Sequence, residues 1–385
     1  MTVIDLCPAP PDFAVDWPAV ERLLDRELMA ATPQGPEFHA EGDVWTHTRM
    51  VCEAMAAHPA WRSLAAGARA VTFAAALLHD VGKPACTRTE PDGRISSRGH
   101  SARGEAMARE MLWRTGVSFG VREHISALIR HHQVPFFLIE GEPAAARRSL
   151  ARLSLIARCD WLALVAEADA RGRRCRDDRD QQSILDKTAL FAELAAEAGV
   201  LDRAWSFADD HSRFAALRDE RRPLDAPVHD DSGPEVIVMS GLPAAGKDAW
   251  LAAHRPELPV VALDDLRSEL EVDPADEQGA VIGAARERAR QHLRRGEPFA
   301  WNATNVSRRL RNGLVELLAS YRARVHIVYV EVAAGEQERR NRARAHPVPR
   351  AALDRIVAKW APPTPAEAHR VTYVVDDPGP IPWPP

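Results

Sequence analysis

The spacing of apolar residues changes near residue 220, and this change limits the possible folds more than any other feature of the sequence. Before it, apolar residues recur every three or four positions, as in RAVTFAAALLHD, where Val71, Ala74, Ala75 and Leu78 form one stripe. After it come the short β-rich runs EVIVMSG, LPVVALD, PFAWNAT, RVHIVYVEV and VTYVV, most of them separated by helical segments. Such alternation is typical of a parallel sheet with helices on both faces. The sequence therefore predicts a multidomain protein in which an all-α domain precedes an α/β domain.

The boundary between the two domains is predicted at a polar segment. The stretch RDERRPLDAPVHDDSGP (218–234) is charged, contains prolines and has almost no large apolar residues, which is typical of an interdomain linker. A chain of 385 residues is also long for a single core. We therefore predict a first domain over 1–220, a linker over 221–234 and a second domain over 235–385.

Composition excludes several classes of protein. The net charge of −5 is not that of a histone-like nucleic-acid binder, although a local basic groove is compatible with it. No apolar run reaches the roughly 18 residues that span a bilayer, and the first residues, MTVIDLCPAPPDF, lack the basic start and apolar core of a signal peptide. The five cysteines are scattered and odd in number, as expected of reduced thiols. These features predict a cytoplasmic protein without a membrane partner.

An adjacent histidine and aspartate, His79 and Asp80, end an apolar helical segment in LLHDVGKP. Imidazole and carboxylate side chains together suit Fe, Mn, Co, Ni or Zn better than calcium. Further candidate ligands stand at intervals along the chain: His47 in VWTHTRMV, His100 in SRGHSARGEAM, His131 and His132 in IRHHQVP, and Asp169 in EADARGR. We interpret His39, His58 and His124 as ordinary helix residues.

The order H…HD…GH…HH…AD.RG resembles the HD superfamily of helical phosphohydrolases over roughly residues 38–175. In particular, it is similar to the HD domain attached to some bacterial tRNA nucleotidyltransferases. The resemblance implies one metal held by His47, His79, Asp80 and Asp169, with Asp160 as the alternative to Asp169. It implies that His100 and His131 complete a second metal site or bind phosphate, with His132 as the alternative to His131, and that Lys83 and His132 lie near the phosphate. A water activated by the metal would then attack phosphorus, because the metal lowers the pKa of that water.

A loop with Walker A spacing, G-x-x-x-x-G-K, follows the first β-rich run in EVIVMSGLPAAGKDAWL. Gly241 and Gly246 bracket the loop, and Lys247 opens the next helix. The backbone N–H groups of such a loop cradle phosphates, and the lysine neutralises the β- and γ-phosphates. Asp248 stands where a serine or threonine usually follows the lysine, and its carboxylate can still take magnesium directly or through water.

Polar residues at the ends of the later runs are candidates for the acceptor side of the site. Asp264 is predicted at the rim of the sheet, where it can accept the proton of an attacking hydroxyl, and Arg267 lies three residues further on. The alternative is a helix-capping aspartate followed by a surface arginine. Arg340 and Arg344 are four residues apart, so we predict that they share a helix face and close over ATP.

The set GxxxxGK, DDxR, NATN and RNxxR…VP resembles the 5′-hydroxyl polynucleotide kinases of the P-loop phosphotransferase superfamily over about residues 236–375. The resemblance implies that Asp264 is the general base, that Arg267 holds the acceptor near its phosphate, and that Arg340 and Arg344 form a lid. Asn302 stands where several relatives carry aspartate. The residues implied to bind ATP and Mg²⁺ are Gly241, Ala245, Gly246, Lys247, Asp248, Asn302 and Arg344.

The order of the two domains resembles the bacterial HD-domain/polynucleotide-kinase fusions that heal broken nucleic acid. It implies that the first domain removes a 2′,3′-cyclic phosphate or a 2′- or 3′-phosphate, and that the second phosphorylates a 5′-OH end. The implied substrates are ATP and RNA or DNA ends, and a nucleic-acid ligase would act downstream. The alternatives are a bifunctional small-molecule or nucleotide kinase and phosphohydrolase, a nucleotide-sensing regulator and a P-loop kinase toxin.

Overall fold

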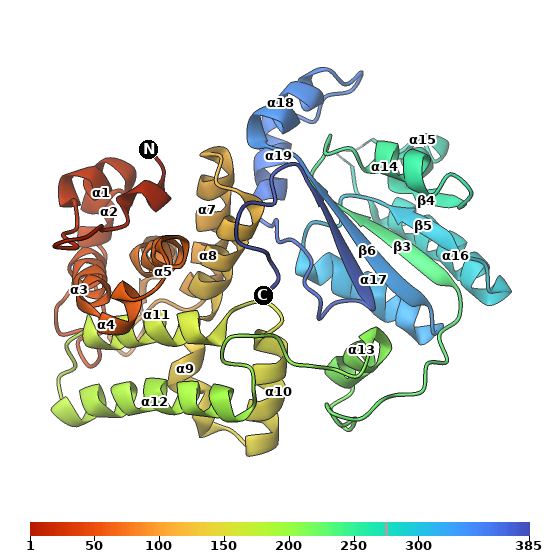
Figure 1. Cartoon of the computed structure of the whole chain (residues 1–385). Coiled ribbons are helices and arrows are strands. Elements are labelled where there is room, and N and C mark those ends of the chain that lie inside the picture. The colour runs from red at the N-terminus through yellow and green to blue at the C-terminus, as the bar shows by residue number, and fades with distance from the viewer. Residues whose placement is uncertain (274–275) are drawn as a thin grey trace. The chain divides into compact units, whose positions relative to one another are not determined.

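The computed structural model describes residues 1–273 and 276–385, which form two compact units (Figure 1). Unit 1 consists of Met1–Trp205 together with Pro378–Pro385, and unit 2 of Ser206–Asp377. Unit 1 is helical and unit 2 contains a five-stranded sheet, so the predicted fold class is confirmed. Among the described residues, no helix is both long enough and apolar enough to cross a bilayer.

Unit 1 is built around one central helix, α5. Every residue of α5 from Val71 to Leu78 is fully buried. A helix that is apolar on all sides must be surrounded by other elements, and Figure 1 shows α5 among its neighbours α3, α8 and α11. The longer helices of the unit are α3 (Val44–Ala57), α5 (Ala66–Leu78), α7 (His100–Arg114), α8 (Phe119–His131), α10 (Pro143–Leu153), α11 (Cys159–Arg171) and α12 (Asp178–Glu197).

Short elements complete unit 1. The short helices are η1 (Val3–Leu6), α1 (Trp17–Leu23), α2 (Arg26–Ala30), α4 (Pro59–Arg62), α6 (Lys83–Cys86), α9 (Val134–Phe137) and η2 (Leu138–Glu140). The strands β1 (Arg88–Thr89) and β2 (Ile95–Ser96) form an antiparallel hairpin. This hairpin was not predicted, because two residues per strand are too few to show an alternating pattern.

The sheet of unit 2 is parallel, with strand order β4-β5-β3-β6-β7. Its strands are β3 (Glu235–Ser240), β4 (Val260–Ala262), β5 (Phe299–Asn302), β6 (Arg324–Glu331) and β7 (Arg370–Val375), one in each of the five predicted runs. The helices are α13 (Asp210–Arg218), α14 (Lys247–His254), α15 (Leu263–Glu269), α16 (Gly279–Arg295), α17 (Arg308–Ser320), α18 (Ala334–Arg342) and α19 (Arg350–Val357).

Alternate residues of the central strand β3 enter two separate cores. Val236 and Val238 pack with apolar residues of α16 and α17. Ile237 and Met239 pack with Leu251 of α14 on the other face. Because successive side chains of a strand point to opposite faces, this division places helices on both sides of the sheet, as predicted.

The compact units end at different residues from the predicted domains. Residues 206–220 were placed in the first domain, but α13 packs in unit 2: Phe214 joins its core, and Arg213 donates to the carbonyl of His369 at 2.6 Å. The predicted linker over 221–234 therefore lies within unit 2. Residues 378–385, assigned to the second domain, belong instead to unit 1.

Candidate functional site

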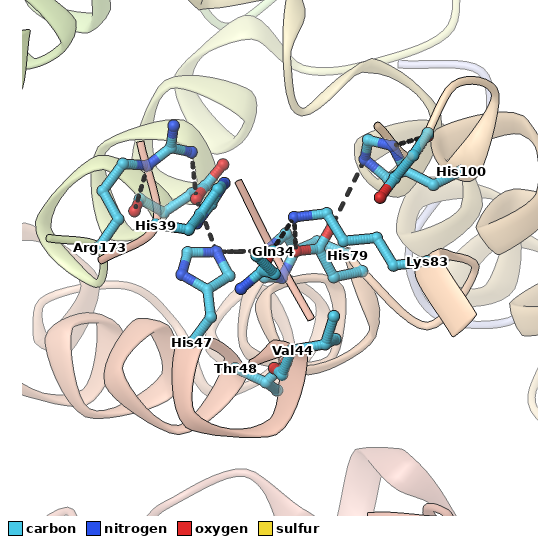
Figure 2. A network of polar contacts seen from close by, with 12 residues as sticks. Gln34, His39, Val44, His47, Thr48, His79, Lys83, His100 and Arg173 are labelled. Atoms are coloured by element: carbon cyan, nitrogen blue, oxygen red, sulfur yellow. Dashed lines mark hydrogen bonds and ion pairs between the residues drawn. The ribbon is translucent and has the colours of Figure 1, made fainter. Parts of the chain in front are cut away.

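A cluster of buried histidines and aspartates lies inside unit 1 (Figure 2). Its members come from separate helices: His47 from α3, His79 and Asp80 from the end of α5, His100 from the start of α7, His132 from the end of α8, and Asp169 from α11. Each is at most 6% exposed. The helical packing of the unit thus brings together side chains that span more than 120 positions of the sequence.

Asp80 lies at the centre of this cluster. Its Oδ2 is 3.2 Å from His79 Nε2 and 3.6 Å from His47 Nε2, and its Oδ1 is 3.3 Å from His100 Nε2. His47 Nε2 is also 3.1 Å from Asp169 Oδ1. Two groups of possible metal ligands therefore share Asp80: His47 and His79 on one side, and His100 and His132 on the other.

The outer ring nitrogens fix the orientation of three histidines. Each Nδ1 donates to a backbone carbonyl: His79 to Ala76 at 2.7 Å, His100 to Ser97 at 2.9 Å, and His132 to Ile129 at 2.8 Å. A proton on Nδ1 leaves the Nε2 lone pair of a neutral ring directed into the cluster, which is the arrangement of metal-binding histidines. Burial lowers the pKa of His132 to about 3, so this ring is neutral near pH 7.

The residues of the cluster fit a divalent transition metal. In the described part of the chain, both carboxylate oxygens of Asp80 are buried and have ion-pair partners but no hydrogen bond of regular geometry. Burial raises the pKa of Asp80, but the charges of His79 and Lys83 outweigh it and hold the pKa well below its usual value. A charged carboxylate together with imidazole nitrogens is a donor set for Mn, Fe, Co, Ni or Zn.

The sequence left two choices open, between His131 and His132 and between Asp160 and Asp169, and the structure distinguishes the members of each pair. His132 Nε2 is 3.4 Å from His100 Nε2, whereas the three candidate ligand groups found among the described residues do not include His131. The position given to His131 is therefore occupied by His132. Asp169 lies in the cluster, and Asp160 pairs with Arg158 at 2.6 Å.

Lys83 and four residues that were not predicted as site residues lie around the cluster, among them His39, which was interpreted as an ordinary helix residue. Lys83 Nζ is 2.7 Å from Asp80 Oδ2 and donates to Gln34 Oε1 at 2.5 Å. Glu41 Oε1 lies 2.9 Å from the Nδ1 atoms of both His39 and His47. Arg173 pairs with Asp169 at 2.5 Å. The pattern R-G-R-R after Asp169 is the one sequence signal for these surrounding residues, because it places arginines one helical turn beyond the aspartate.

The Walker A segment forms a tight loop between β3 and α14. Gly241, Ala244 and Gly246 have φ angles of 149°, 63° and 108°. A Cβ atom at Gly241 would lie 2.3 Å from the carbonyl oxygen of Val330, so only glycine fits there. Lys247 Nζ donates to the carbonyls of Gly241 and Leu242 at 3.1 and 3.0 Å.

The side chain of Lys247 is electrostatically unusual. Burial lowers its pKa to about 8, against the opposing charges of Asp248 and Asp264, and the charge of Arg344 adds to the lowering. These three predicted site residues therefore act on the ammonium group electrostatically. The adjacent Asp248 accepts a hydrogen bond from Asn302 Nδ2 at 2.5 Å, which joins the start of α14 to the end of β5.

The predicted acceptor and lid residues lie on three segments of unit 2. Asp264 stands in the first turn of α15, two residues after β4, and pairs with Arg267; its side chain is 75% exposed. Arg340 Nη1 donates to the carbonyl of Ala245 in the loop at 3.3 Å. The prediction that Arg340 and Arg344 share a helix face is wrong, because α18 ends at Arg342 and Arg344 lies beyond its C-cap.

Comparison with known proteins gives the class of each unit. Residues 43–164 match the model of the HD domain, and residues 236–363 match that of an AAA domain. The chain therefore joins an HD domain to a P-loop kinase-like domain, as the sequence predicted. This combination supports a bifunctional phosphohydrolase and kinase.

Individual relatives cover only part of this chain. It is similar to the multifunctional CCA protein of Acidovorax sp. (strain JS42), with 34% identity over 49% of this chain and 40% of the relative. It is also similar to the multifunctional CCA protein of Cupriavidus metallidurans, with 30% identity over 47% of this chain and 42% of the relative. The chain thus spans about two fifths of the length of these curated relatives.

Two solved structures are similar at low identity. One is a protein from Chloroflexus aurantiacus j-10-fl that is described as a kinase, with 14% identity, a TM-score of 0.31, and coverage of 38% of this chain and 86% of that one. The other is a gluconokinase from Sinorhizobium meliloti 1021, with 19% identity, a TM-score of 0.28, and coverage of 37% and 83%.

Proposed function

We propose that the protein prepares broken nucleic-acid ends for ligation. Unit 2 transfers the γ-phosphate of ATP to a 5′-OH end, and unit 1 hydrolyses a 2′,3′-cyclic phosphate or a 2′- or 3′-phosphate at the other end. Both reactions are phosphorus chemistry on the two termini that many ribonucleases leave. A ligase would use the resulting ends.

The exposure of Asp264 is the observation that carries the proposed acceptor. Its carboxylate acts electrostatically on Lys247, yet its side chain is 75% exposed. Among the described residues, a carboxylate with this exposure is accessible to the hydroxyl at the end of a nucleic-acid polymer. Arg267, paired with the same carboxylate, would hold a phosphate of the acceptor strand.

The kinase step follows from these positions. Asp264 accepts the proton of the 5′-OH while the hydroxyl oxygen attacks the γ-phosphorus and ADP leaves. Lys247 and the loop N–H groups neutralise the phosphates, and Arg340 and Arg344 stabilise the charge on the transferred group. Asp248, held by Asn302, is the carboxylate available to the magnesium that accompanies ATP.

The hydrolytic step belongs to the buried cluster of unit 1. His47, His79, Asp80 and Asp169, with His100 and His132 beside them, would hold a divalent metal, and such a metal would supply Lewis acidity and lower the pKa of a water. Lys83, 2.7 Å from Asp80, is the cation available to the substrate phosphate. The order of the histidines and the central position of Asp80 support this assignment.

A single substrate tests both halves. An oligonucleotide with a 5′-OH and a 2′,3′-cyclic phosphate is incubated with labelled ATP, Mg²⁺ and Mn²⁺ or Co²⁺, and both ends are analysed. We expect a labelled 5′-phosphate and loss of the cyclic phosphate. Asp264→Asn should lower 5′-phosphorylation by roughly 10²–10⁴-fold, and Asp265→Asn is the matched control. If ATP phosphorylates nucleosides or sugars but not oligonucleotides, the small-molecule alternative replaces the proposed function.

A further inference from the structure

The carboxylate of Glu41 lies against a proposed metal ligand without belonging to the predicted ligand set. Its side chain is 1% exposed, and its Oε1 lies 2.9 Å from His47 Nδ1. The same oxygen lies 2.9 Å from His39 Nδ1, and its Oε2 accepts the backbone N–H of Arg174 at 2.9 Å. Burying a carboxylate in this way requires that donors surround it. His39 Nδ1 and the backbone N–H of Arg174 donate to it, and His47 Nδ1 lies within donor distance but without regular hydrogen-bond geometry.

Two interpretations of His39, Glu41 and His47 are possible, since their ligand atoms lie within 4.8 Å of one another. They could hold a further cation, or Glu41 could orient His47. The ring of His47 decides between them. Its Nε2 faces Asp169 at 3.1 Å and His79 at 3.3 Å. A cation on its Nδ1 as well would require the imidazole to lose both ring protons, which is costly for a ring that can instead donate Nδ1–H to Glu41.

The position of His47 in its helix explains why a carboxylate is needed. His79, His100 and His132 stand at helix ends, and each donates Nδ1–H to the carbonyl three residues earlier. His47 stands inside α3, where the carbonyl of Val44 accepts from Thr48 Oγ1 and that of Asp43 accepts from the backbone N–H of His47. Its outer nitrogen therefore finds its acceptor on another segment of the chain.

The segment that carries Glu41 is held in place by backbone hydrogen bonds. Ala40 N donates to the carbonyl of Arg174 at 2.7 Å, and Arg176 N donates to that of Glu37 at 2.9 Å. The same loop after α11 carries Arg173, which pairs with Asp169. One stretch of chain, 173–176, thus holds both the aspartate of the cluster and the carboxylate behind His47.

We infer that Glu41 is a positioning residue of the metal site. It accepts the Nδ1 proton of His47, holds the ring in one tautomer and directs Nε2 into the cluster. His39 and Arg174 hold Glu41 in turn. A carboxylate behind a histidine also increases the basicity of the ring, and loss of such a partner weakens metal binding by roughly 10–100-fold. The inference rests on the metal site proposed for unit 1.

Cobalt binding to the full-length protein tests this role independently of catalysis. The protein is freed of metal with a chelator, and Co²⁺ affinity, stoichiometry and visible spectrum are measured by competition with a chromophoric chelator. We expect Glu41→Gln to weaken binding by about 10-fold and Glu41→Ala by up to about 100-fold. Circular dichroism and the melting temperature of the metal-free proteins show whether each variant is folded.

Glu167→Gln is the matched control, because Glu167 also pairs with a histidine of unit 1, His58, at 3.2 Å. It should bind Co²⁺ as the wild type does. Folded Glu41 variants with wild-type affinity would overturn the positioning role while leaving the proposed metal site in place. Loss of one Co²⁺ equivalent in His39→Ala would overturn it in favour of a further cation. A wild-type protein that binds no Co²⁺ would remove the proposed metal site and the inference together.

Discussion

At the scale of single residues, the end of α8 presents two adjacent histidines, of which one faces the cluster. His132 is 1% exposed and lies 3.4 Å from His100, while its own Nδ1 is held by Ile129. We expect His132→Ala to lower phosphohydrolysis and Co²⁺ affinity at least 10-fold, because it removes a nitrogen directed at the proposed metal. His131→Ala should change each by less than threefold. Equal losses in the two variants would contradict the assignment of His132.

The depressed pKa of Lys247 predicts how ATP binding depends on pH. In the free protein, burial lowers this pKa to about 8. The phosphates of ATP favour the charged ammonium, so the pKa rises in the complex. ATP affinity should therefore be constant just below pH 8 and fall about tenfold per pH unit above it, until the pKa of the complex is reached. Binding at pH 8.5 should take up a proton.

Calorimetry in two buffers of different ionisation enthalpy measures that proton uptake, and titrations from pH 7.5 to 9.5 give the affinity. Lys247→Met is the control: its affinity should be low and independent of pH over this range. A wild-type affinity that stays constant up to pH 9.5 would show that the ammonium does not titrate there.

The sequence predicted the local geometry of single residues where a motif carries its own spacing. The Walker A residues form the tight loop that the motif predicts, and the helices that supply His47, His79, Asp80, His100 and Asp169 bring these side chains together. The identity of the histidine at the end of α8 was not predictable, because two adjacent residues on a helix point about 100° apart and the sequence does not give the phase. Glu41 escaped prediction because its role depends on backbone pairing with residues 173–176.

At the scale of elements, residues 378–385 are an integral part of unit 1. The Pro378 carbonyl accepts from the backbone N–H of Gly120 at 3.0 Å, and that of Pro382 lies 2.9 Å from His124 Nε2. The Trp383 indole stands edge-on to Phe119 and donates to the carbonyl of Ile156 at 3.0 Å. This segment therefore covers the start of α8.

Deleting residues 378–385 should lower the melting temperature of unit 1. Loss of a partly buried tryptophan and its hydrogen bonds is worth roughly 1–4 kcal/mol. Gly120→Ala should act in the same direction, because a Cβ atom there would lie 1.9 Å from the Ile381 carbonyl. Differential scanning calorimetry measures both. Gly141→Ala, whose new atom would be 3.9 Å from its nearest neighbour, is the matched control; an unchanged melting temperature in Gly120→Ala would contradict the packing of this segment.

The sequence predicted all five strands of the sheet, because short β-branched runs separated by helical segments leave few alternatives. It did not predict that α13 belongs to unit 2 or that residues 378–385 belong to unit 1. In α13, only Phe214 and Leu217 are large apolar residues, so its local pattern does not show what it packs against. The C-terminal segment is rich in proline and makes several of its contacts through main-chain carbonyls, which no side-chain pattern records. Long-range packing, rather than local propensity, determines the unit to which α13 and residues 378–385 belong.

At the scale of the whole molecule, the two candidate sites draw on separate units. The histidine cluster is made by residues of Met1–Trp205, and the phosphate loop, Asp264 and Arg340 by residues of Ser206–Asp377. We therefore expect Lys247→Ala to abolish 5′-phosphorylation and leave cyclic-phosphate hydrolysis within about twofold of wild type. Asp80→Asn should abolish cyclic-phosphate hydrolysis and leave 5′-phosphorylation within about twofold of wild type. Assays of each end on the same oligonucleotide measure both activities, and loss of both in a folded single variant would contradict their independence.

Unit 1 is formed by two separate parts of the sequence, and this affects how it folds during synthesis. Ribosomes add about 5–20 residues per second, and a domain usually folds as soon as its sequence has emerged. Here residues 206–377 are synthesised between the helices of unit 1 and the segment that covers Phe119 and Gly120. Residues 378–385 are thus synthesised roughly 10–30 s after the helices of unit 1. During that interval the apolar start of α8 is open to chaperones, and the folding of unit 1 is completed only after unit 2 has been translated.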